Sequence, residues 1–194
     1  MEKKFKLIDK KNLYSGFFEL NKFTFKHKKH DGSWSTPISR EIFSGAQVAS
    51  VLPYDPSSKK FILLDQFRSG LIENHDNPVL KEIVAGIIDK NETPAEAAIR
   101  ECKEEIGSDI NKLTKILTYY PAPGSSQSLY HLFLGEVNSF KGARILGEKN
   151  ENEDILARCY TIEETKKMLN DQKIINGLTL IALQWFFLNH QTNI

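Results

Sequence analysis

Three glutamates stand close together in the stretch RECKEEIG, residues 100–107. At about 100° per residue, a helix places Glu101 and Glu105 side by side on one flank, with Glu104 a little further round. Like charges four residues apart destabilise an isolated helix by roughly 0.2–0.5 kcal/mol per pair, and glutamates near a helix C-terminus oppose its dipole. A hard divalent cation would compensate them, because Mg²⁺ and Mn²⁺ prefer carboxylate oxygens. The spacing therefore predicts a metal site.

The plainer interpretation of these glutamates is a solvated acidic face. It fits poorly, because no lysine stands four residues after Glu101 or Glu104 to form the favourable pair. The helix itself is strongly indicated. Thr93-Pro94-Ala95-Glu96 is a capping box with proline at the first helical position, and Gly107 is a typical end. The apolar face is expected to consist of Ala95, Ala98, Ile99, Cys102 and Ile106.

Composition narrows the class of protein. The chain has 194 residues, 40% hydrophobic and 26% charged, which is enough for one sizeable core, or for one core with a small appendage. A net charge of +1 gives no sign of a nucleic-acid partner. The start, MEKKFKLIDKK, lacks the apolar segment of a secretory signal, and the apolar run LTLIALQWFFL is too short to span a bilayer. The two cysteines show no metal-ligand spacing and no disulfide framework, so we expect a cytoplasmic protein without a membrane partner.

Strand signals stand on both sides of the helix. Asp31-Gly32 is a hairpin-turn dipeptide between two extended runs, and Pro56-Ser57-Ser58 separates the next two. Further strands are predicted in VLKEIVAG, KILTYY, LYHLFLGEV and ILARCYT, and further helices from Thr161 and over GLTLIALQWFFLNH. This mixture predicts an α+β or α/β sandwich with a strand-rich N-terminal appendage.

The glutamate-rich stretch resembles the signature of the Nudix hydrolases. Gly86, five residues, Glu92, seven residues and then RECKEEIG reproduce its invariant glycines, glutamates and arginine at the required spacing. Cys102 and Ser108 stand where the family usually has aliphatic residues. The resemblance implies an α+β fold of the α/β/α sandwich type with a mixed central sheet. It also implies a Nudix domain over residues 44–194 and an N-terminal antiparallel strand ribbon over residues 1–43 that serves dimerisation.

In this family the signature holds Mg²⁺ against a diphosphate. A pyrophosphate bridge is anionic and repels nucleophiles, so metal ions must neutralise it and help to generate hydroxide. By position, the resemblance implies the carbonyl of Ala85 and the carboxylates of Glu101 and Glu105 as ligands of Mg²⁺, or of Mn²⁺. Glu104 would be a further ligand or a close neighbour of the metal. Four motif residues would be structural, namely Gly86, Glu92, Arg100 and Gly107, with an ion pair between the arginine and the first glutamate.

The flanking sequence resembles the bacterial ADP-ribose pyrophosphatases within this family. The match covers nearly the whole chain and includes Pro121-Ala122-Pro123-Gly124, a segment typical of that branch. In that branch the catalytic base comes from an acidic loop, here GEKNENED over residues 147–154. Alignment gives Glu151 as the base, acting with Glu101 and Glu105, and Glu153 as an additional metal ligand. The reverse order of Glu151 and Glu153 stays open, and the plainer interpretation of the run is a solvated loop.

Five residues are expected to contact the substrate by resemblance. Arg68 would pair with a phosphate, while Phe17 and Arg40 would reach into the partner subunit's site, where Phe17 would stack on adenine. The branch usually continues its Pro-Gly loop to a glutamate that holds the terminal ribose. This chain has Ser128 at that position with Gln127 beside it, so a hydrogen bond there would lack charge assistance. The plainer interpretations of Phe17 and Arg40 are a core aromatic and a surface arginine.

Three functions are compatible with the sequence. The flanks favour a homodimeric enzyme that hydrolyses ADP-ribose to AMP and ribose 5-phosphate with Mg²⁺. The second function is hydrolysis of another nucleoside diphosphate sugar, such as GDP-mannose or ADP-glucose. The third is a nucleotide-sugar-binding module without turnover, and the presence of Glu101, Glu104 and Glu105 argues against it.

Overall fold

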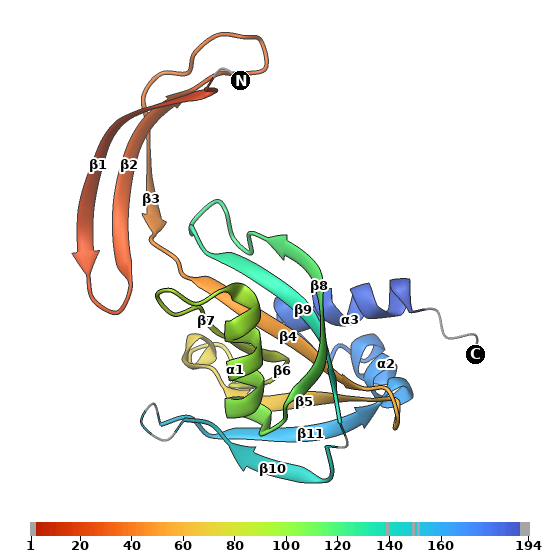
Figure 1. Cartoon of the computed structure of the whole chain (residues 1–194). Coiled ribbons are helices and arrows are strands. Elements are labelled where there is room, and N and C mark those ends of the chain that lie inside the picture. Colours follow the sequence, from red (N-terminus) through yellow and green to blue (C-terminus); the bar gives the residue numbers. More distant parts are fainter. Residues whose placement is uncertain (1–2, 139, 149, 151, 191–194) are drawn as a thin grey trace. The chain divides into compact units, whose positions relative to one another are not determined.

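The chain forms two compact units (Figure 1). The computed structural model describes residues 3–138, 140–148, 150 and 152–190. The N-terminal unit comprises the described residues up to Gln47 together with Tyr119–Leu129. The second unit comprises Val48–Thr118 and the described residues from Tyr130 onward. The grouping of Tyr119–Leu129 with the N-terminal strands has no signal in the sequence.

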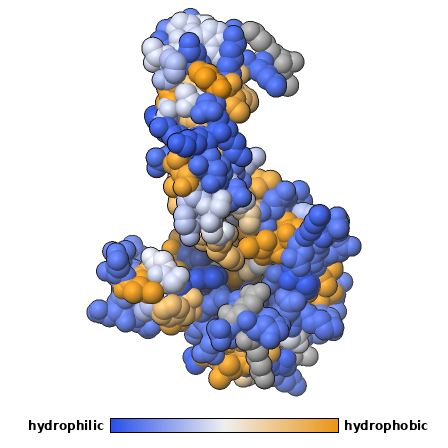
Figure 2. All heavy atoms as spheres, turned by 90° about the vertical axis from the view of Figure 1, so that its left-hand side faces the viewer, coloured by the Kyte–Doolittle hydropathy of each residue, from blue (hydrophilic) through white to orange (hydrophobic). Residues whose placement is uncertain are grey.

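The N-terminal unit is a three-stranded antiparallel sheet. Strands β1 (Phe5–Ser15), β2 (Glu19–His27) and β3 (Ile38–Phe43) follow one another in spatial order. The hairpin predicted at Asp31-Gly32 connects β2 and β3, and Gly32 adopts a φ of +83° that glycine tolerates. Strand β1 was not predicted. All of its residues are exposed. Figure 2 shows orange apolar side chains among blue hydrophilic ones on the surface of the N-terminal unit.

Among its described residues, the second unit contains an eight-stranded mixed sheet. Its principal order is β10-β11-β5-β4-β9-β8, with β6 paired to β5 and β7 paired to β4. The strands are β4 (Gln47–Asp55), β5 (Lys60–Phe67), β6 (Val79–Glu82), β7 (Val84–Ile87), β8 (Ile110–Tyr119), β9 (Leu129–Val137), β10 (Ala143–Leu146) and β11 (Ile155–Thr161). The run VLKEIVAG is therefore two strands that break at Ile83 and pair with different neighbours, and β10 was not predicted.

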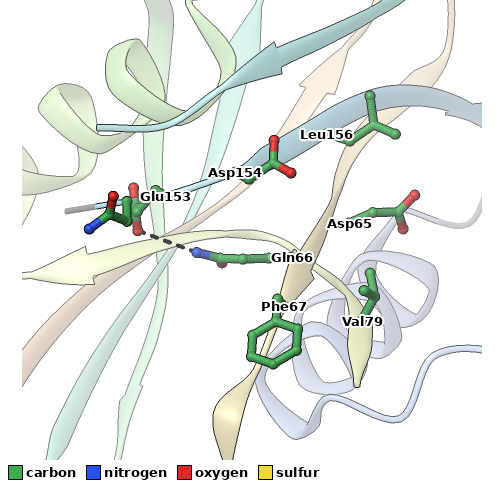
Figure 3. A pocket seen from close by; sticks show the side chains of 8 residues that line it. Asp65, Gln66, Phe67, Val79, Glu153, Asp154 and Leu156 are labelled. Atoms are coloured by element: carbon green, nitrogen blue, oxygen red, sulfur yellow. Dashed lines mark hydrogen bonds between the residues drawn. The ribbon is translucent and has the colours of Figure 1, made fainter. Parts of the chain in front are cut away.

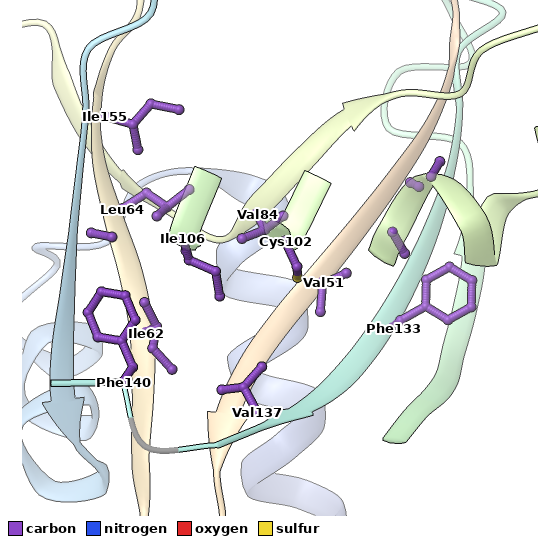
Figure 4. Packing of buried hydrophobic residues seen from close by; sticks show 14 residues of the cluster. Val51, Ile62, Leu64, Val84, Cys102, Ile106, Phe133, Val137, Phe140 and Ile155 are labelled. Carbon is purple, nitrogen blue, oxygen red and sulfur yellow. The ribbon is translucent and has the colours of Figure 1, made fainter. Parts of the chain in front are cut away.

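In the described part of the chain, three α-helices accompany the sheet: α1 (Pro94–Ile106), α2 (Ile162–Asn170) and α3 (Gly177–Asn189). Successive side chains of a strand point to opposite faces, so β5 serves two layers. Ile62 and Leu64 pack in the core cluster with residues of α1 (Figure 4), whereas Phe61 meets Phe186 of α3 edge-on at 4.8 Å. The predicted α+β sandwich is confirmed. None of the described helices is long and apolar enough to cross a bilayer.

The boundaries of α1 agree with its sequence signals. Thr93 and Glu96 form the predicted capping box, and Gly107 ends the helix in the left-handed conformation with a φ of 61°. The predicted apolar face is partly wrong, because Ala95 and Ile99 are exposed and Ala97 is buried. The reason is that two glutamates of the helix also point inward, which rotates the buried face away from the direction of the apolar residues. That inward pair defines the candidate active site.

Candidate active site

The C-terminal half of α1 turns Glu101 and Glu105 toward strand β7. Glu105 is 3% exposed and Glu101 9%, whereas the side chain of Glu104 is 39% exposed. The backbone N–H of Ala85 donates a hydrogen bond to Oε2 of Glu105 at 3.2 Å. The structure thus brings together Ala85 and the two glutamates that the sequence assigns to one metal site, and it leaves Glu104 at the surface.

These two carboxylates lie in surroundings that favour a positive charge. Burial and then the neighbouring charge of Glu101 raise the pKa of Glu105 well above its usual value. Burial also raises the pKa of Glu101, against the opposing effect of Arg100. Glu153 contributes to raising both pKa values, so its carboxylate lies within electrostatic reach of the pair. A divalent cation would remove this unfavourable concentration of negative charge.

Arg100 supplies part of the compensation. Its guanidinium donates to both carboxylate oxygens of Glu92 at 3.0 Å, to Glu101 at 2.6 Å and to Glu104 at 3.0 Å. It also donates to the carbonyl of Ile87 at 3.0 Å, which ties the end of strand β7 to the helix. The ion pair expected between Arg100 and Glu92 is therefore present. The compensating cation is thus Arg100, which precedes Glu101 and Glu104 in the sequence. The sequence analysis considered only a lysine four residues after each glutamate and therefore missed it.

Gly86 is required by the close approach of Glu101. A Cβ atom built on Gly86 would overlap the Glu101 carboxylate, although the backbone there is not in the left-handed region. The absence of a side chain at Gly86 thus leaves room beside β7 for the carboxylate of Glu101. This explains in physical terms why the signature has glycine at this position.

Arg68 forms an ion pair that the sequence did not suggest. Its Nε donates to Oε1 of Glu82 at 2.9 Å and its Nη2 donates to Oε2 at 2.7 Å. Glu82 is 3% exposed, at the end of β6. These hydrogen bonds, and beyond them the charges of Glu105 and Glu153, raise the pKa of Arg68. The available signal was a charged residue inside the apolar run VLKEIVAG.

The acidic loop is anchored through Glu153. Its Oε1 accepts a hydrogen bond from Nε2 of Gln66 at 3.3 Å (Figure 3), and its Oε2 accepts one from the backbone N–H of Glu148 at 3.3 Å. Gly147, with a φ of +115°, lies so close that an added Cβ would meet Glu153. Gln66 is a second residue that the sequence analysis missed. Glu151 lies outside the described residues.

A cavity of about 520 Å³ opens beside Glu153 and Gln66. Figure 3 shows Gln66 extending across it toward the glutamate, while the exposed ring of Phe67 lies at its border. The cavity is lined by Asp65, Gln66, Phe67, Val79, Asn152, Glu153, Asp154 and Leu156. The acidic loop that Glu153 anchors therefore forms part of the wall of this cavity.

Four of the expected substrate contacts belong to the N-terminal unit. Phe17 is 86% exposed and meets Phe18 edge-on at 4.8 Å, so the plainer interpretation as a core aromatic is wrong. Arg40 is exposed and donates to the carbonyl of Ser39 at 2.8 Å. Gln127 is also exposed.

Ser128 is held within its own loop. Its N–H donates to Oγ of Ser126 at 3.1 Å, and the two hydroxyl groups lie 2.9 Å apart. The loop is joined to the N-terminal sheet, because the N–H of Phe43 donates to the carbonyl of Ser125 at 2.9 Å. In addition, the N–H of Gln127 in this loop donates a hydrogen bond to the carbonyl of Phe43 at 3.1 Å. Residues 125–128 therefore belong to the same unit as Phe17 and Arg40, and the glutamates of α1 belong to the other.

Known proteins share these features. A family model described as NUDIX domain matches residues 46–177. A protein named ADP-ribose pyrophosphatase from Haemophilus influenzae is 37% identical over 187 residues, covering 95% of this chain and 86% of that protein. A protein of the same name from Escherichia coli strain K12 is 34% identical over 185 residues, covering 95% and 88%.

Two further matches are more distant. A protein named GDP-mannose pyrophosphatase from Salmonella arizonae is 27% identical over 191 residues and covers 98% of both chains. A crystal structure described as ADP compounds hydrolase gives a TM-score of 0.75 at 18% identity, over 99% of this chain and 98% of that chain. Because the NUDIX model covers most of the chain and two relatives exceed 30% identity over most of their length, the chain belongs to the Nudix hydrolase family.

Proposed function

We propose that this enzyme hydrolyses the pyrophosphate bond of ADP-ribose, giving AMP and ribose 5-phosphate. The observation that carries the proposal is the buried pair Glu101 and Glu105 beside Ala85. It stands in a chain that is 37% identical to a protein named ADP-ribose pyrophosphatase over 95% of its length. A cytoplasmic location is part of the proposal, supported by two cysteines that form no disulfide.

We propose Mg²⁺ as the cofactor, with Mn²⁺ as a substitute. The donors fit a hard cation, because the carboxylates of Glu101 and Glu105 and the carbonyl of Ala85 offer oxygen atoms only. Among the described residues no three acidic, histidine or cysteine side chains already form a metal-binding group. Glu153 would complete the set from the loop, because its carboxylate lies within electrostatic reach of Glu101 and Glu105, and Glu104, which pairs with Arg100, would remain a neighbour. When bound, the cation would neutralise the diphosphate and activate water.

The protein's own residues would then divide the work. Gly86 leaves room for Glu101, and the Arg100–Glu92 pair fixes the helix relative to the preceding loop. Arg68 would hold a phosphate of the substrate. Glu151 would take the proton from the attacking water, since a carboxylate beside an activated water suits general-base catalysis.

A second candidate function is hydrolysis of GDP-mannose or of ADP-glucose. The observation that favours it is Ser128 at the position where the ADP-ribose branch usually has glutamate, together with the match to a protein named GDP-mannose pyrophosphatase. The test compares kcat/KM for ADP-ribose, ADP-glucose and GDP-mannose with saturating Mg²⁺. We expect ADP-ribose to be the best substrate, and a higher kcat/KM for GDP-mannose would replace the first function by the second.

Gly86→Ala is expected to lower turnover by a factor on the order of 10², the scale of a displacement of about 1 Å in a reacting group. The added methyl group would displace the Glu101 carboxylate. Steady-state kinetics measure the loss. Gly177→Ala is the matched control, because an added Cβ there meets nothing within 4 Å. Normal turnover of Gly86→Ala would contradict the placement of Glu101.

We also propose a homodimer in which Phe17 and Arg40, both of the N-terminal unit, serve the partner's site. The exposed ring of Phe17 and the fully exposed strand β1 support a partner surface. Mixing Glu105→Gln with the double variant Phe17→Ala, Arg40→Ala tests it.

After subunit exchange, activity should recover to about a quarter of the wild-type level, because half of randomly mixed dimers are hybrid and each hybrid has one intact site. The measurement is the rate of AMP release, with each variant alone as the control. No recovery after proven exchange would mean that these residues do not act across a dimer.

A further inference from the structure

Glu82 presents its carboxylate to Arg68 as a two-point clamp. Both oxygens accept, from Nε at 2.9 Å and from Nη2 at 2.7 Å. Such a fork fixes the plane of the guanidinium as well as its position, which a single hydrogen bond does not do. The side chain of Glu82 is only 4% exposed, whereas that of Arg68 is 42% exposed. The clamp therefore lies on the buried side of the arginine.

Strand register places Glu82 on the face that carries the glutamates of α1. Glu82 is directly opposite Leu64 across the β5–β6 pair, and paired residues share a face of the sheet. Leu64 belongs to the core cluster that packs with α1. The backbone of Arg68 continues this register, since its N–H donates to the carbonyl of Pro78 at 2.8 Å.

The clamp leaves the arginine able to bind an anion. A guanidinium has five N–H donors, and Glu82 takes two of them, on Nε and Nη2. Within the described part of the chain no acceptor is found for the three others, two on Nη1 and one on Nη2, so they remain for a ligand on this partly exposed side chain. The charges of Glu105 and Glu153 also act on this guanidinium and raise its pKa, so it lies within reach of the carboxylate cluster.

We propose that Glu82 is a positioning residue for the hydrolytic reaction, holding Arg68 so that its remaining donors meet a phosphate of the nucleoside diphosphate sugar. The inference rests on the proposed function, because it takes Arg68 as a phosphate contact. A purely structural ion pair is the competing explanation. It predicts a loss of stability without a specific loss of substrate binding.

Glu82→Gln keeps the shape of the side chain but removes its charge and one of its two acceptors. We expect kcat/KM to fall about 10- to 100-fold, the scale of a charge-assisted hydrogen bond, with most of the change in KM because Arg68 contacts the bound substrate directly. Glu136→Gln is the matched control. It removes a carboxylate from another cross-strand ion pair, with Lys112 at 3.0 Å, and should leave kcat/KM unchanged.

A double-mutant cycle decides between the two explanations. Glu82→Gln is measured in the wild type and in an Arg68→Ala background, with Arg68→Met, which is also uncharged, in its place where the alanine variant does not fold. If Glu82 acts through Arg68, its substitution should change kcat/KM less than about twofold once the arginine is gone. An equal effect in both backgrounds, or a fall in melting temperature with unchanged KM, would overturn the proposal.

The cycle uses the full chain with saturating Mg²⁺ and ADP-ribose. GDP-mannose replaces ADP-ribose if the wild type cleaves it better. The choice of substrate thus tests the proposed function by itself, while the coupling between Glu82 and Arg68 tests the positioning role on whichever substrate is cleaved.

Discussion

Glu105→Gln is expected to lower ADP-ribose turnover by a factor on the order of 10³, because a metal ion that stabilises the transition state contributes several kcal/mol. Glu105 is the more buried of the two inward glutamates, at 3% exposed. The fold should remain intact, since the amide oxygen of glutamine can still accept from the N–H of Ala85. Steady-state kinetics at saturating Mg²⁺ measure the loss of turnover, and calorimetric titration with Mn²⁺ measures the loss of metal binding.

Glu104→Gln serves as the comparison for this prediction. Glu104 lies on the same helix but is exposed and paired with Arg100, so its substitution should have a much smaller effect than that of Glu105. Near-normal activity of Glu105→Gln at saturating Mg²⁺ would exclude it as a main ligand.

Glu105→Gln should also change how the stability of the fold depends on pH. Burial raises the pKa of Glu105 above its unfolded value of about 4.5, so the folded metal-free protein binds this proton more tightly than the unfolded chain. The resulting stabilisation is complete below that unfolded value and is lost as the pH rises through the folded pKa. In EDTA at pH 8, Glu105→Gln should therefore melt at a higher temperature than the wild type. The difference should shrink toward pH 4.5, and a constant difference across this range would contradict the raised pKa.

Glu151→Gln is expected to lower turnover by a factor on the order of 10²–10⁴, the usual contribution of a general base. Affinity for Mn²⁺ should change little. Glu153→Gln should instead weaken Mn²⁺ binding, because the Glu153 carboxylate is anchored by Gln66 and Glu148 and lies within electrostatic reach of Glu101 and Glu105. Both variants are compared by kinetics and by Mn²⁺ titration.

The paired design also detects an exchange of roles. If Glu153→Gln loses turnover with normal metal affinity while Glu151→Gln loses the metal, Glu153 is the base and Glu151 the ligand. Asn150→Ala, in the same loop, controls for a general disturbance of the loop. Full activity of both glutamine variants would remove the base from this loop.

Local signals predicted the elements that carry the site. The capping box at Thr93 and the stop at Gly107 are contained in neighbouring residues, and both define α1 as expected. The placement of Glu101 and Glu105 side by side followed from their spacing, but their burial did not, because a pattern of apolar residues gives no weight to buried carboxylates.

Long-range pairings could not be predicted in the same way. The contact between Arg68 and Glu82 joins residues of two segments across a strand pair, and the break at Ile83 depends on β6 and β7 choosing different neighbours. Arg100 compensates three glutamates at once, which only the folded geometry reveals. Local charge rules along a helix consider one such pair at a time.

The rate of AMP release from ADP-ribose, measured as Mg²⁺ is returned to chelator-treated protein, tests most directly whether the buried glutamates serve a metal-dependent hydrolysis. We expect no AMP in excess EDTA, and a saturable rise with Mg²⁺ that yields AMP and ribose 5-phosphate in equal amounts. AMP release in EDTA at the full rate, or no AMP at any Mg²⁺ concentration, would contradict the proposed reaction.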